Sequence, residues 1–122
     1  MTWDIRAATN YAKQHAHAHS IRQCAEYTRK AIHAGGIDIG HTGHAKDYGS
    51  LLINAGFRPV SPYESPRAGD VVILQPYVGG NASGHMAIFD GQEWYSDFRQ
   101  RDMWAGPGYR TAKPQYTIYR RN

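Results

Sequence analysis

A single thiol and a distant imidazole are the side chains best suited to nucleophilic chemistry in this chain. Cys24 is the only cysteine among 122 residues, and it directly follows 20–23, where Ser20 and Gln23 have the spacing of a capping box. Unpaired N–H groups and the positive end of the helix dipole favour a thiolate near such a helix start. His85 opens an apolar run, 86–89, after a Ser-Gly pair. We expect it at the mouth of a sheet, where a general base can keep one ring nitrogen free.

Each of these two residues also has an ordinary structural interpretation. Cys24 falls in the apolar stripe of the same predicted helix, and a lone cysteine in a small domain is often an inert buried side chain. His85 taken alone fits a surface or core histidine. The two residues carry chemistry only if the fold brings them together.

The residue that orients His85 depends on the register of a predicted hairpin. A two-residue turn at Asp90-Gly91 sets His85 opposite Ser96, whereas a three-residue loop sets it opposite Asp97. A slip of one residue exchanges the two faces of a strand, so burial of the apolar face should set the register. The longer loop is the one that gathers the more apolar side chains on one face. We therefore predict Asp97 as the orienting carboxylate, with Ser96 as the alternative.

Helical patterns come first in the chain and extended patterns second. A period of 3.6 residues predicts helices over 4–15, 20–34 and 45–55, and glycines follow the last two. Short apolar runs bounded by turn residues predict strands over 71–74, 85–89, 93–98 and 115–120. This order predicts an α+β fold for a single domain over 1–122, with N-terminal helices packed on a small antiparallel sheet.

The charge, the cysteine count and the apolar segments of the chain exclude several classes of protein. The net charge of +4 suits a polyanionic partner, but the basic residues form no recognised nucleic-acid motif, so we expect a solvated basic surface and no nucleic-acid partner. A single cysteine excludes an intrachain disulfide. The first 20 residues lack an apolar core, so we expect no signal peptide, and no apolar stretch is long enough to insert into a membrane.

Two further groups of residues have types that could form a site. His15 and His19 have the i, i+4 spacing of metal ligands on a helix, but no Glu or Cys is placed to complete a site, so we expect no metal and no cofactor. Trp104 and Tyr109 lie in a predicted loop beside a Pro-Gly pair. They fit either the anchoring of that loop or the lining of a substrate groove.

Four segments carry a family resemblance, in the family's order. They are 20–36, 67–73, 84–91 and 94–98. Together they resemble the cysteine- and histidine-dependent amidohydrolase/peptidase family, a papain-like branch of the NlpC-type cell-wall peptidase superfamily. The resemblance implies a peptidoglycan peptidase in which Cys24 attacks an amide of the stem peptide or crosslink and His85 is the base. It also implies that the Cys24 N–H contributes to an oxyanion hole, where one donor is typically worth about 3 kcal/mol.

Within that superfamily, the short chain and the aspartate after Trp94-Tyr95-Ser96 most resemble type VI secretion amidase effectors. This resemblance implies a monomer made in the cytoplasm, delivered to the periplasm of a target bacterium, and matched by an immunity protein that covers the cleft around Cys24. Two alternatives stay open. One is a phage or housekeeping cell-wall lysin of the same chemistry, and the other is a non-catalytic module that binds an anionic polymer.

Overall fold

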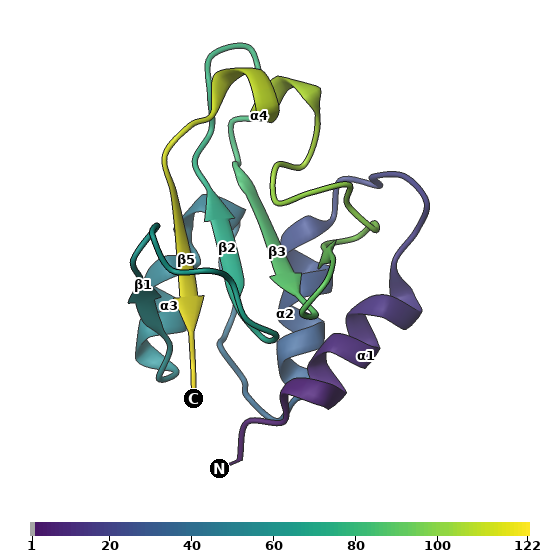
Figure 1. Cartoon of the computed structure of the whole chain (residues 1–122), viewed down its shortest axis with the longest axis vertical. Coiled ribbons are helices and arrows are strands. Elements are labelled where there is room, and N and C mark those ends of the chain that lie inside the picture. The colour runs from purple at the N-terminus through teal and green to yellow at the C-terminus, as the bar shows by residue number, and fades with distance from the viewer. Residues whose placement is uncertain (1) are drawn as a thin grey trace.

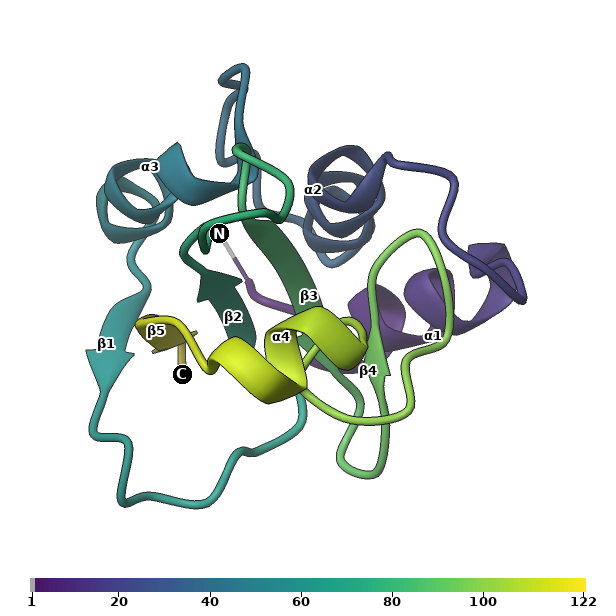
Figure 2. The same cartoon turned by 90° about the horizontal axis from the view of Figure 1, so that it is seen from above.

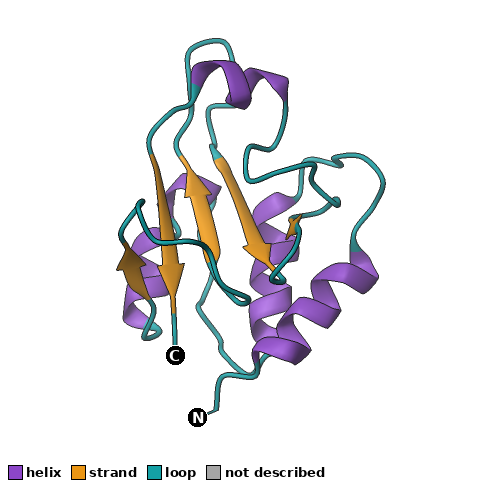
Figure 3. Ribbon diagram, in the orientation of Figure 1, coloured by secondary structure: helices purple, strands orange, loops and turns teal. Residues whose placement is uncertain are grey.

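A five-stranded antiparallel sheet organises the chain, with the strand order β1-β5-β2-β3-β4 (Figures 1 and 3). The computed structural model describes residues 2–122. The strands are β1 Arg58–Val60, β2 Val71–Leu74, β3 His85–Phe89, β4 Trp94–Tyr95 and β5 Tyr116–Arg120. Because the main helices precede the sheet in sequence, the predicted α+β class is confirmed.

Three helices cover one face of the sheet and a short fourth helix crosses its upper end (Figures 1 and 2). They are α1 Ile5–His15, α2 Cys24–Ala34, α3 Gly49–Asn54 and α4 Pro107–Ala112, with a 3₁₀ turn, η1 Ala45–Asp47, before α3. None of the helices in residues 2–122 combines the length and the apolar character needed to cross a membrane.

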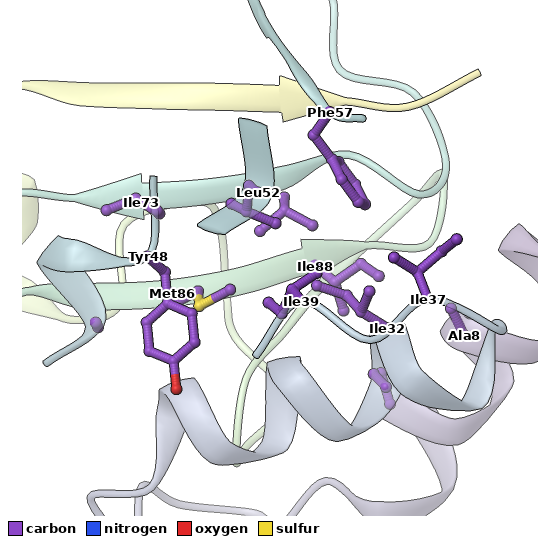
Figure 4. Packing of buried hydrophobic residues seen from close by; sticks show 14 of the residues in the cluster. Ala8, Ile32, Ile37, Ile39, Tyr48, Leu52, Phe57, Ile73, Met86 and Ile88 are labelled. Carbon is purple, nitrogen blue, oxygen red and sulfur yellow. The ribbon is translucent and has the colours of Figure 1, made fainter. Parts of the chain in front are cut away.

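The core lies on both faces of the two central strands. Successive side chains of a strand point to opposite faces, so Ile73, Met86 and Ile88 face the helices, while Val72, Leu74 and Ala87 join the cluster that includes Tyr109 of α4. Figure 4 shows Ile32 of α2 and Leu52 of α3 packed over the helix-facing set. Burial on both faces explains why β2 and residues 86–88 of β3 are continuous apolar runs.

The hairpin between β3 and β4 adopts neither of the registers considered from sequence. Ile88 pairs with Tyr95 and Phe89 pairs with Trp94, so the connection is longer than either predicted turn. The side chain of Asp90 builds this longer turn, because its Oδ1 accepts the N–H groups of Gln92 at 2.8 Å and Glu93 at 2.7 Å.

The observed register changes which side chains share a face. Tyr95, rather than Trp94, joins Met86 and Ile88 on the helix-facing side, where Tyr95 is 2% exposed. The strand ends at Tyr95, because the next residues turn and the Ser96 N–H donates to the Phe98 carbonyl at 3.0 Å. Asp97 therefore lies in a turn beyond β4 and not opposite His85, so the predicted register was wrong.

Other element boundaries also differ from the prediction. α2 starts at Cys24 rather than at residue 20, because Arg22 has a left-handed φ of 62° that no helix accommodates. The predicted helix over 45–55 is divided into η1 and α3. β1 contains Pro59, which an edge strand tolerates, and α4 begins with Pro107 at its first turn but is too short to show a helical period.

A buried ion pair joins the ends of β5 and β2. The guanidinium of Arg120, 4% exposed, donates from Nε to Asp70 Oδ1 at 2.9 Å and from Nη2 to Oδ2 at 2.8 Å, while Asp70 is fully buried. The Arg67 N–H also donates to Asp70 Oδ2 at 2.8 Å. Such a bidentate pair constrains the orientation of both side chains and neutralises their charges. It therefore holds the turn before β2 against β5.

We expect Arg120→Met to lower the free energy of unfolding by about 3–5 kcal/mol, because it leaves the Asp70 carboxylate buried without its partner. Urea denaturation measures this change. Arg99→Met is the matched control, because Arg99 pairs with Glu93 at 2.7 Å with its side chain 66% exposed, and such surface pairs contribute only about 0–1 kcal/mol. Equal losses in the two variants would contradict a special role for the buried pair.

Candidate active site

Cys24 and His85 line the same cavity, which has a volume of about 730 Å³. The first residue of α2, the first residue of β3 and helix α4 all line the cavity. Figure 2 shows these three elements from above. Its wall also includes Gln23, Tyr48, Tyr77, Gly84, Phe98 and Tyr109. The fold therefore brings together two side chains that are far apart in sequence.

The thiol of Cys24 rests against the beginning of β3. Backbone groups of Met86, Ala25 and Cys24 itself lower the pKa of the thiol, which places the sulfur near the first residues of β3. The hydroxyl of Thr28 lies 2.8 Å from the Cys24 carbonyl oxygen and 3.2 Å from that of Met86, so it ties the first turn of α2 to β3. Since His85 directly precedes Met86, these contacts place the thiol beside the strand that carries the imidazole.

Asp97, and not a capping box, holds the segment before α2. Its Oδ2 accepts the N–H of Ile21 at 2.6 Å and that of Gln23 at 3.1 Å, and the Ser20 hydroxyl lies at 3.4 Å. Gln23 is the N-cap residue but makes no side-chain cap bond. The predicted Ser20–Gln23 box was wrong, because the Asp97 carboxylate, from a distant part of the chain, accepts the Gln23 N–H that the Ser20 hydroxyl would have bound.

Asp97 is fully buried and its other contacts hold it in place. The Ser96 hydroxyl donates to Asp97 Oδ1 at 3.1 Å, and the His17 N–H donates to the Asp97 carbonyl at 2.8 Å. Within residues 2–122, neither Asp97 nor Ser96 hydrogen-bonds His85, so the predicted direct contact is absent. Asp97 instead acts on His85 at longer range, where its negative charge raises the pKa of the imidazole.

The hydrogen-bond partner of His85 is Gln100. His85 Nε2 lies 2.6 Å from Gln100 Oε1, and Gln100 Nε2 donates to the carbonyls of Asp102 at 3.0 Å and Met103 at 3.3 Å. Because the amide nitrogen donates to those carbonyls, Oε1 must face the ring and accept a hydrogen bond from Nε2–H. The neutral imidazole therefore carries its proton on Nε2 and leaves Nδ1 as a free base.

Burial sets the protonation of both groups. It is the largest cause that lowers the pKa of His85 below its ordinary value of 6.5, and the Gln100 hydrogen bond and the Asp97 charge offset only part of this shift. Burial also raises the pKa of the Cys24 thiol to about 11, against backbone hydrogen bonds that lower it. Backbone groups at the helix start lower the pKa of the thiol, but burial outweighs them, so the thiolate expected from sequence is not the favoured form. At neutral pH the pair is a thiol and a neutral imidazole.

Gln100 is the site residue that sequence reasoning missed. It lies in an irregular segment after β4, where its N–H donates to the Trp94 carbonyl at 2.9 Å, and its side chain is 3% exposed. No periodicity or motif marks it. Only a polar side chain placed soon after the predicted hairpin could have suggested it.

The histidine-rich segment before Ser20 makes structural contacts. The ring of His15 stacks on Tyr11 with centroids 3.8 Å apart, and His17 Nε2 lies 3.0 Å from the Tyr27 hydroxyl. In residues 2–122, no three His, Cys, Asp or Glu side chains are grouped as metal ligands.

Comparison with known proteins identifies the family. No protein-family model and no curated protein matches the chain. A solved structure does match, the type VI native effector–immunity complex Tae3-Tai3 from Ralstonia pickettii. The sequence identity is 46% and the TM-score is 0.92, over 98% of this chain and 100% of the matched chain. This chain belongs to the Tae3 family of type VI effectors. The selenomethionine form of the complex matches with 48% identity and a TM-score of 0.87, over 93% of this chain and 98% of that one.

The hydrogen bond between Gln100 and His85 gives a direct test of the site. We expect Gln100→Glu to raise the pKa of His85 by about 1–2 units, because a carboxylate at this position stabilises the imidazolium. Titration of the imidazole signals by NMR measures the shift. Gln92→Glu, the same change at an exposed position, should leave the pKa of His85 unchanged. A similar shift in both variants would show that the overall charge, and not the contact, is responsible.

Proposed function

We propose that this protein is a cysteine amidase that hydrolyses an amide bond in the stem peptides or crosslinks of peptidoglycan. The observation that carries the proposal is the shared cavity of Cys24 and His85, with Nδ1 of the imidazole left free by Gln100. A nucleophile, a base and a group that orients the base are the parts that thiol hydrolases of the papain-like type require. Membership of the Tae3 family supports an amidase effector as the setting for this chemistry.

The acylation step follows from the neutral pair. His85 Nδ1 accepts the thiol proton while Cys24 Sγ forms a bond to the carbonyl carbon of the amide, and the carbonyl oxygen becomes an oxyanion. When the oxyanion collapses, the carbon–nitrogen bond breaks and His85 returns the proton to the leaving amine. The product of this step is a thioester on Cys24 and one free amine fragment.

Hydrolysis of the thioester completes the cycle. His85 takes a proton from a water molecule, and the water oxygen bonds to the thioester carbon. Breakage of the carbon–sulfur bond then releases the carboxylic acid fragment, and the sulfur regains its proton. During both steps the N–H of Cys24 can donate to the oxyanion, since a first-turn N–H has no acceptor within its helix.

Asp97 and Gln100 are positioning residues in this mechanism. Asp97 holds the segment that presents Cys24, and its charge favours the imidazolium that forms during each step. Gln100 holds the imidazole ring in the tautomer that the base requires. We propose this division of roles in place of a single orienting carboxylate.

The proposed biological setting is antibacterial delivery. The similar structures are effector–immunity complexes of Tae3 with Tai3, and we propose that this protein likewise has a cognate immunity protein, which occupies the cavity around Cys24. The proposed site of action is the periplasm of the target bacterium, where peptidoglycan is accessible to an effector delivered by type VI secretion.

We expect Cys24→Ala to abolish hydrolysis of purified sacculi, because the nucleophile is lost while the half-buried position keeps a small side chain. Mass spectrometry of the released muropeptides measures the activity and identifies the bond. Circular dichroism should show an intact fold. Wild-type activity in this variant would refute the mechanism, and sacculus binding without cleavage by the wild type would favour a binding module.

The pH dependence tests the neutral pair. Neutral imidazole is the active base, and the pKa of His85 lies below 6.5. Activity is therefore present above that pKa and lost as pH falls through it. We expect kcat/KM to show an acid limb with a midpoint below 6.5 and to stay level on the alkaline side of neutrality. A preformed thiolate–imidazolium pair would instead lose activity in the mildly alkaline range, as the imidazolium deprotonates.

A further inference from the structure

The hydroxyl of Tyr109 is a buried donor that the mechanism above leaves unused. Tyr109 belongs to α4 and is 8% exposed, and its Oη has no hydrogen-bond partner within residues 2–122. Buried polar groups are almost always paired, so an unpaired hydroxyl needs a partner that is not part of the chain. The same side chain lines the cavity that holds Cys24 and His85.

The Tyr109 ring lies close to the imidazole of His85, in the cavity that Cys24 also lines. Its centroid is 6.0 Å from that of the His85 imidazole and 4.9 Å from that of Tyr77. Burial, followed by the charge of the Cys24 sulfur, raises the pKa of Tyr109 to about 12. The phenol therefore stays protonated at neutral pH, so it can donate a hydrogen bond but cannot serve as a base.

The position of Tyr109 is fixed by the segment that also fixes Gln100. Arg110 Nη1 donates to Asp102 Oδ1 at 3.1 Å and to the Trp104 carbonyl at 3.2 Å, which ties α4 to this segment. The Asp102 carbonyl is one of the two that hold the Gln100 amide. Helix α4 also contacts the side chain of Tyr77. The contact is close, because a Cβ at Gly108 would overlap the Tyr77 hydroxyl. A donor held in this way is preorganised before substrate binds.

We propose that the Tyr109 hydroxyl donates a hydrogen bond to the scissile carbonyl oxygen and acts, with the Cys24 N–H, as the second donor to the oxyanion. This role rests on the proposed amidase function. The carbonyl oxygen gains negative charge only as the thiol attacks, and a fixed donor at that point stabilises the transition state more than the bound substrate. Tyr109 is then a catalytic residue, and it lines the cavity from helix α4 rather than from the predicted loop.

The first measurement is the kinetics of Tyr109→Phe, which keeps the ring and removes only the hydroxyl. We expect kcat to fall about 10²- to 10³-fold, as for loss of other oxyanion donors, with KM nearly unchanged. Tyr116→Phe is the matched control, because its ring packs on Trp104 at 5.4 Å, in the same apolar cluster as Tyr109, but outside the cavity. This control should keep wild-type activity.

A second measurement separates a role at the oxyanion from a role at the sulfur. Alkylation of Cys24 by iodoacetamide needs the thiol and His85 but forms no oxyanion, so Tyr109→Phe should be alkylated at the wild-type rate. A stem-peptide aldehyde forms a hemithioacetal whose oxygen mimics the oxyanion, so it should bind this variant more weakly than the wild type.

The outcomes distinguish the proposals from each other. Full hydrolytic activity in Tyr109→Phe, in an enzyme that needs Cys24, would overturn the role of Tyr109 and leave the amidase function standing. Equal losses of hydrolysis and alkylation would also overturn it, because the hydroxyl would then act on the sulfur or on the fold. Activity in Cys24→Ala would overturn the amidase function, and the role of Tyr109 with it.

Discussion

The buried carboxylate of Asp97 is the constraint on which the site depends. A fully buried carboxylate must have its oxygens hydrogen-bonded, and Asp97 meets this need with the N–H groups of Ile21 and Gln23 and the hydroxyl of Ser96. These bonds hold the segment before α2 in a non-helical conformation, so that the helix begins at Cys24. One interaction between distant parts of the chain therefore presents the thiol at the helix start, beside β3.

Strand β3, an interior strand of the sheet, holds the imidazole near the thiol. It pairs with β2 on one side and β4 on the other, and its first residue is His85. The irregular segment that follows β4 then returns along the cavity and contributes Gln100, and α4 contributes Tyr109. The site thus combines a rigid strand and helix start with side chains from a segment that has little regular structure, a common division between scaffold and functional loop.

Burial has opposite effects on the two reacting groups and so determines how they work together. It lowers the pKa of His85 and raises that of Cys24, which leaves both groups neutral in the free protein. The Asp97 charge acts in the same direction on both, by disfavouring the thiolate and favouring the imidazolium. In the proposed mechanism, a neutral pair of this kind suits proton transfer during attack rather than before it, so donors to the oxyanion would supply much of the stabilisation.

Short-range periodicity and neighbouring turn residues were enough to predict the α+β class, a helix that contains Cys24 and a strand that starts at His85. The start of that helix at Cys24, rather than at residue 20, depended on Asp97. The tertiary structure alone decided the hairpin register, the partners of Asp97, the contact of Gln100 with His85 and the burial of the Tyr109 hydroxyl. The register depended on the Asp90 side chain and on which aromatic residue the helices cover. The other three depend on contacts between residues far apart in sequence, in segments whose backbone follows no repeating pattern, so no local signal marks them.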